Sequence, residues 1–302
     1  MSSSICLISH PLRFHAETNG SPTNLLFRSP NPKGNPLKHK WRNRFRCYRI
    51  NKDKPEQEEL FQGFSALPSD VPWDIESVWS TIAAHIFILH IPLSFGGLSI
   101  VSRLLHQPVL DPWTETVSIL VLQTTELLGT LLLLRYTVKK KFVLLPVVFR
   151  GKKSPEGRKW VKASALALGF LILLVLVSSF VLDRLTGVKA ANNTILKELL
   201  LSGTSPKVAF FWIYCFVTPM LEETVYRGFL LSSLASTMKW QNAVIISSCV
   251  FSASHFSGEN FVQLFLIGCV LGSTYCWTGD IRSSFAVHSL YNAILLLFTI
   301  LS

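Results

Sequence analysis

Charged residues are scarce in this sequence, and its cysteines show no paired spacing. Charged side chains make up 16% of the 302 residues, whereas 49% are hydrophobic. The 6 cysteines form no C-x-x-C pair and no even framework, so neither a disulfide scaffold nor a zinc ribbon is indicated. Four of them lie in apolar segments, where cysteine packs as a small hydrophobic side chain. We therefore expect these cysteines to serve packing rather than thiol chemistry.

Apolar runs make up much of the chain. Several extend over about 17 to 25 residues, the length that a helix needs to cross a bilayer. This pattern excludes a soluble domain and predicts an all-α, polytopic membrane helix bundle of about seven spans. The expected spans lie near residues 75–101, 113–134 and 160–182, in a helix starting near Pro206, and near 241–256, 260–277 and 283–301. Gly268 and Gly272 are spaced for a close helix approach, although ordinary membrane glycines would look the same.

Acidic residues are almost missing from residues 1–50. Nine lysines and arginines stand there against one acid, Glu17, so this segment carries most of the net charge of +11. The charge therefore does not indicate nucleic-acid binding. An acid-poor segment rich in serine, asparagine, proline and arginine is typical of an organelle transit peptide, and its prolines favour a plastid over a mitochondrion. The alternative is a disordered basic tail that stays in the mature protein.

The predicted organisation follows from these shifts in composition. We expect a disordered transit peptide over 1–50, a polar linker over 51–74, amino-terminal membrane spans over 75–204 and a second membrane domain over 205–302. The strongly basic connection 135–159 should face the stroma by the positive-inside rule, with 183–206 on the opposite side. The predicted location is a chloroplast membrane, and the sequence does not distinguish the envelope from the thylakoid.

Three ionisable residues lie inside the first two expected spans. His85 and His90 stand five residues apart, and on an α-helix they would diverge by about 140°. We therefore expect satisfied interior histidines rather than a shared metal site. Glu126, near the centre of the second span, is explained equally well as a site residue or by an interior partner, and its role stays open.

The most unusual stretch is 216–231, where two carboxylates and a guanidinium interrupt an apolar run. An ionised group in hydrocarbon is unfavourable by about 2.5 to more than 10 kcal/mol, so such residues face the interior of a bundle and usually serve function. Glu223 and Arg227 are four residues apart and can pair on one helix face. Glu222 points about 100° away around the axis and needs another partner.

Other polar residues punctuate the apolar segments that follow. His255 ends the sequence Phe251-Ser-Ala-Ser-His, whereas His288 and Asn292 share a helix face in the last span. A carboxylate, two histidines and an amide that converge in a water-containing cavity can activate water and stabilise an oxyanion.

The order E-E-x-x-x-R, F-x-x-x-H and H-x-x-x-N over residues 205–301 resembles the CAAX prenyl protease and bacteriocin-processing family of intramembrane proteases. The resemblance implies an intramembrane endopeptidase that acts on membrane-associated proteins or peptides, with 205–302 as its catalytic domain. It implies that Glu222 and His255 activate the water and that His288 and Asn292 hold the oxyanion. Glu223 and Arg227 would support the site.

Metal dependence is a separate question. Glu222, His255 and His288 could form a two-histidine, one-glutamate zinc set. The sequence contains no H-E-x-x-H pattern, and Asn292 suits an oxyanion hole better than zinc, so we favour hydrolysis without a metal. Two other functions are compatible with the same set of polar residues. A catalytically silent scaffold or assembly factor of the same fold stays open, whereas a transporter is disfavoured because no inverted repeat is visible.

Overall fold

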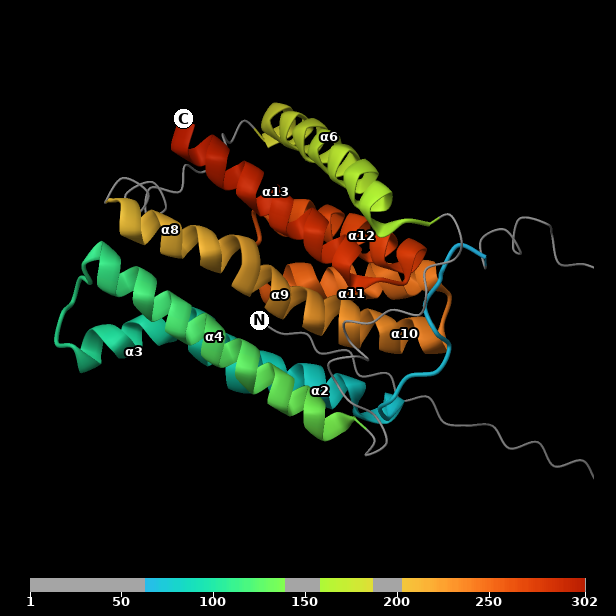
Figure 1. The fold of residues 1–302 in the computed structure, drawn as a ribbon, viewed down its shortest axis with the longest axis horizontal. Coiled ribbons are helices and arrows are strands. Elements are labelled where there is room, and N and C mark those ends of the chain that lie inside the picture. The colour runs from blue at the N-terminus through green and yellow to red at the C-terminus, as the bar shows by residue number, and fades with distance from the viewer. Residues whose placement is uncertain (1–62, 139–157, 187–202, 302) are drawn as a thin grey trace, which may run out of the picture. The chain divides into compact units, whose positions relative to one another are not determined.

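The computed structural model describes residues 63–138, 158–186 and 203–301. The expected transit peptide and most of the basic connection lie outside these ranges, as does much of the segment 183–206. Within the described ranges every regular element is a helix, and the one strand-like pairing is an isolated bridge between Trp73 and Val138. The all-α prediction is therefore confirmed for this part of the chain (Figure 1).

The first membrane helix is irregular in its hydrogen bonding. A 3-10 turn, η1 (Ile75–Ser77), leads into α2 (Val78–Ala84) and then into the π-helix η2 (His85–Phe95). Gly96 separates η2 from α3 (Gly97–Leu104), and the spanning helix Ile75–Phe95 ends directly before it.

Two longer helices follow. α4 (Pro112–Thr137) begins at a regular cap, because the Asp111 side chain accepts a hydrogen bond from the backbone N–H of Thr114 at 3.0 Å. Pro112 fits the first turn since no donor is needed there. α6 covers Trp160–Thr186 and exposes apolar side chains along its length, including Leu166, Phe170 and Leu173. Large exposed apolar faces indicate a surface that meets lipid rather than water.

Five consecutive elements form one helix of 34 residues, Thr204–Thr237. They are α8 (Thr204–Trp212), η3 (Ile213–Val217), α9 (Thr218–Glu222), η4 (Glu223–Leu231) and α10 (Ser232–Thr237). The π-helical parts η3 and η4 flank α9, in which Pro219 has no backbone N–H to donate. Glu222 ends α9 and Glu223 begins η4, so the glutamate pair lies where the hydrogen-bonding pattern changes. Such π turns occur frequently at functional sites.

The last three helices are α11 (Trp240–Ser254), α12 (Phe261–Thr278) and α13 (Ile281–Leu301). Among the described residues, 6 helices are long and apolar enough to cross a bilayer. The expected span 241–256 is not among them, because α11 has 15 residues. At about 22 Å it falls short of the hydrocarbon core of about 30 Å.

Close packing joins the carboxyl-terminal helices. α12 contacts α11, α6 and α13. A Cβ atom at Gly268 would lie 2.9 Å from the Cβ of Ser248, and one at Gly272 would lie 3.3 Å from Val244. The close approach predicted for these two glycines is confirmed, and it holds α11 against α12.

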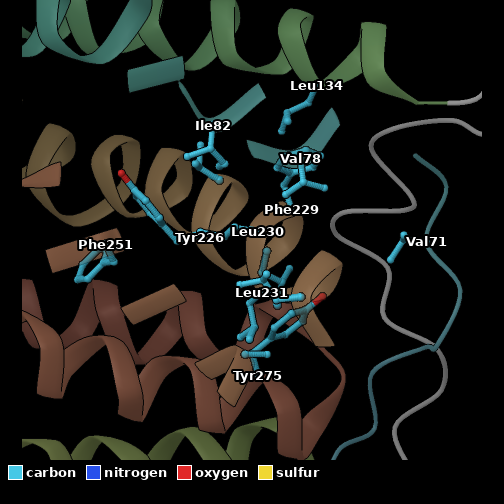
Figure 2. Packing of buried hydrophobic residues seen from close by; sticks show 14 of the residues in the cluster. Val71, Val78, Ile82, Leu134, Tyr226, Phe229, Leu230, Leu231, Phe251 and Tyr275 are labelled. Atoms are coloured by element: carbon cyan, nitrogen blue, oxygen red, sulfur yellow. The ribbon is translucent and has the colours of Figure 1, made fainter. Parts of the chain in front are cut away.

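The core gathers around the helix that carries the two glutamates. All nine residues of η4 are buried. Figure 2 shows Val78 and Ile82 of α2 on one side of this helix, with Phe251 of α11 and Tyr275 of α12 on the other. Because packed helices cover η4 on both sides, its charged residues have to find partners within the protein.

The expected polar linker, 51–74, is described from residue 63 onward. There it packs into the core, because Val71 and Trp73 are buried and the Trp73 indole N–H donates to the Ser233 hydroxyl at 2.7 Å. Phe64 stacks on Trp240 with ring centroids 4.3 Å apart. The linker interpretation is therefore wrong for residues 63–74. The prediction relied on the polar composition of the whole segment and overlooked its few apolar residues, which pack into the core.

Candidate active site

Glu222 lies between two histidines from different helices. Its Oε1 is 3.6 Å from Nε2 of His255, the residue that follows α11, and its Oε2 is 3.5 Å from Nε2 of His288 in α13. The Glu222 side chain is 12% exposed and that of His255 is 29% exposed. The centre of the group is therefore largely enclosed, with a partial opening at His255.

Glu223 and Arg227 form a buried ion pair. Arg227 Nη1 lies 3.1 Å from Glu223 Oε1, as the four-residue spacing predicts, and both side chains are at most 2% exposed. The guanidinium also lies over the ring of Phe251, 4.5 Å from its centroid, which is a favourable cation–π position. The charge of Arg227 therefore balances Glu223 inside the bundle.

His288 contacts both glutamates. Its Nδ1 lies 2.9 Å from Glu223 Oε1, whereas its Nε2 faces Glu222. The spacing of the motif residues predicted the Glu223–Arg227 pair but not this contact, which depends on how α13 packs against η4. The buried ion pair is thus connected to Glu222 through one imidazole ring.

His255 and Asn292 are oriented by backbone carbonyls. His255 Nδ1 lies 2.7 Å from the carbonyl oxygen of Phe251. A carbonyl only accepts, so Nδ1 donates to it, and Nε2 is the ring nitrogen that faces Glu222. Asn292 stands one helical turn beyond His288, and its side-chain amide donates to the carbonyl of Tyr214 at 2.9 Å. The structure thus brings Glu222, Glu223, Arg227, His255 and His288 into one contact network and anchors Asn292 to η3.

The donor types around Glu222 fit zinc in kind. Two imidazole nitrogens and a carboxylate are a common zinc set, and a carboxylate behind a ligating histidine, as Glu223 is behind His288, is the usual supporting arrangement. The two oxygens of Glu222, however, each face a different histidine. The donor set is therefore compatible with zinc in the kind of its ligand atoms.

His85, His90 and Glu126 form a second group, whose ligand atoms lie within 4.8 Å of one another. The expected divergence of the two histidines is wrong, because η2 is a π-helix and its i→i+5 hydrogen bonds place residues five apart above one another. Both rings reach α4, where His85 Nδ1 lies 3.1 Å from the Thr130 hydroxyl and His90 Nδ1 lies 2.7 Å from Glu126 Oε1. The prediction that these histidines are satisfied in the interior is confirmed.

Comparison with known families supports the assignment of the carboxyl-terminal region. Residues 204–294 match the model described as Type II CAAX prenyl endopeptidase Rce1-like, and this range contains all three motifs. Neither the curated proteins nor the solved structures contain a match to the chain. Residues 204–294 of the chain are therefore similar to the CAAX prenyl endopeptidase family.

Proposed function

We propose that this protein is an intramembrane endopeptidase in which Glu222 and His255 activate a water molecule for peptide hydrolysis. The fold is that of a CAAX-type intramembrane protease. The observation that carries the proposal is the position of the Glu222 carboxylate, 3.6 Å from Nε2 of His255 and enclosed by packed helices. A carboxylate and an imidazole that face one another at this separation can both contact a single water.

The reaction assigns a separate role to each group. The water oxygen attacks the carbonyl carbon of the peptide while one of its protons passes to Glu222, and the imidazole of His255 orients the water through Nε2. That proton then moves to the leaving amine nitrogen as the C–N bond breaks. A carboxylate that accepts and later returns one proton acts as both general base and general acid.

The negative charge on the carbonyl oxygen needs donors during the attack. His288 faces Glu223 through Nδ1 and Glu222 through Nε2, so an N–H at Nε2 would point toward the reacting group beside Glu222. The side-chain amide of Asn292 has two hydrogens, and one of them is bonded to Tyr214. We assign the oxyanion to His288 and the second amide hydrogen of Asn292. Glu223 and Arg227 hold His288 in place.

Zinc, if bound, would be held by Glu222, His255 and His288, and it would polarise the carbonyl and the attacking water. The proposal favours hydrolysis without it. The substrate would be a membrane-associated protein or peptide. The plastid location is part of the proposal and rests on residues 1–50 alone.

The test uses purified full-length protein in lipid nanodiscs with a library of fluorogenic membrane peptides. The wild type should cleave at least one peptide, whereas Glu222→Gln should be inactive and equally stable, because the amide keeps the volume and loses the proton acceptor. Glu259→Gln, an exposed carboxylate outside the site, is the matched control and should stay active. Retained activity after removal of metal with a chelator would support metal-free hydrolysis. Cleavage by Glu222→Gln at the wild-type rate would refute the mechanism, and a wild type that cleaves no peptide would favour the scaffold function.

A further inference from the structure

A polar network lies between η2 and α4, outside the part of the chain that matches the family. Glu126 is fully buried, and both of its carboxylate oxygens have partners: His90 Nδ1 lies 2.7 Å from Oε1, and the Ser94 hydroxyl donates to Oε2 at 2.6 Å. The side-chain amide of Gln123 donates to the Ser94 hydroxyl at 2.8 Å. Both oxygens of the buried Glu126 carboxylate are thus satisfied by partners within the protein.

One end of the network reaches the residue before His255. The Nε2 atom of His90 lies 3.2 Å from the carbonyl oxygen of Ser254. Nδ1 of the same ring faces a carboxylate and Nε2 faces a carbonyl, which only accepts, so the ring has to donate through Nε2. The bond to Glu126 orients the ring for this contact, as a carboxylate behind a histidine commonly does.

The other end reaches the helix that carries Glu222. The Thr218 hydroxyl lies at the long distance of 3.5 Å from Gln123 Oε1. Thr218 stands one helical turn before Glu222 in α9. The amino-terminal helices therefore contact the backbone segments that present both proposed water-activating residues.

The backbone directly after α11 adopts an uncommon conformation. Phe256 directly follows His255 and has a φ of 50°, in the left-handed region that a residue with a Cβ atom rarely adopts. Its ring meets the edge of Phe95 with centroids 5.2 Å apart, and Phe95 in turn meets His90 at 5.5 Å. η2 thus contacts the residue on each side of His255.

We propose that His90, oriented by Glu126, is a positioning residue that fixes His255 relative to Glu222. The inference rests on the proposed function for its effect on catalysis, whereas its structural part concerns only the end of α11. The same contacts argue against a metal at His85, His90 and Glu126, because the ring nitrogens of His90 and the oxygens of Glu126 already have protein partners.

The test compares His90→Leu combined with Glu126→Gln, which removes the contact without leaving a buried charge, with His85→Leu. His85 lies in the same π-helix and contacts Thr130 instead of Ser254. Hydrogen–deuterium exchange of peptides covering 251–261 is measured in nanodiscs, together with kcat and KM for a cleaved peptide. We expect the double variant to exchange faster at residues 255–257 and to lose about 10- to 100-fold in kcat with little change in KM, because a 1 Å misplacement has effects of this size. His85→Leu removes a ring that stacks on His90 at 5.8 Å but no contact with Ser254, so it should change the exchange and kcat much less than the double variant does.

Unchanged exchange in the double variant would overturn the proposal, whatever its activity. Faster exchange with wild-type kcat would also overturn it, because the contact would then have no bearing on His255. An equal loss of kcat in His85→Leu would show a general effect of packing and would overturn it as well. If exchange rises while the wild type cleaves nothing, the placement of His255 by His90 stands and the proposed hydrolysis fails.

Discussion

Removing the positive member of the buried ion pair should destabilise the protein strongly. In Arg227→Ala, Glu223 keeps its place at 1% exposure without the guanidinium that lies 3.1 Å away. Breaking a buried pair in this way reduces the free energy of unfolding by about 3 to 5 kcal/mol. The alanine also loses the contact of the guanidinium with the ring of Phe251.

This loss corresponds to a decrease in melting temperature of about 6 to 20 °C for a domain of this size. The Glu223→Gln, Arg227→Met double variant should recover part of it, because neither charge is then left alone in the interior. Its activity should stay low, since His288 loses the carboxylate that lies 2.9 Å from its Nδ1.

Melting temperatures in detergent and turnover of a cleaved peptide would be measured for all variants. Arg282→Met is the control, since the Arg282 side chain is 63% exposed, although that of its partner Asp280 is 8% exposed. Water screens the exposed guanidinium, so its loss should lower the melting temperature less than the loss of the buried Arg227 does. If Arg227→Ala melts no lower than this control, the argument from a stranded buried charge is refuted.

Three further predictions concern packing, topology and processing. Gly268→Ala should lower the free energy of unfolding by about 1 to 3 kcal/mol, because its Cβ would meet Ser248 at 2.9 Å; an unchanged denaturation midpoint would contradict the close packing of α11 and α12. Protease protection on intact organelle membranes should show the connection 135–159 on the stromal side and 183–206 on the other, and digestion of both from one side would disprove this topology. Amino-terminal sequencing of the mature protein should begin after about residue 45, whereas an intact Met1 would rule out a cleaved leader.

The sequence alone determined what depends on residues near one another in the chain. Long apolar runs specify membrane helices, because a bilayer leaves no other way to satisfy the backbone. The spacing of Glu223 and Arg227 specifies their pairing, since residues four apart meet on a helix face. The three motifs by themselves also indicated the similarity that the family model shows for residues 204–294, because each motif occupies a single helix or its end.

Tertiary packing decided the features that join distant segments. His288 lies 65 residues after Glu223 in the chain, and its contact with both glutamates depends on how α13 packs. The π-helical hydrogen bonds of η2 turned His90 toward Glu126 against the α-helical expectation, because periodicity counted from sequence assumes one regular helix type. The position of His255 beside Glu222, just past the end of α11, likewise depends on how α11 packs against the helix that carries Glu222.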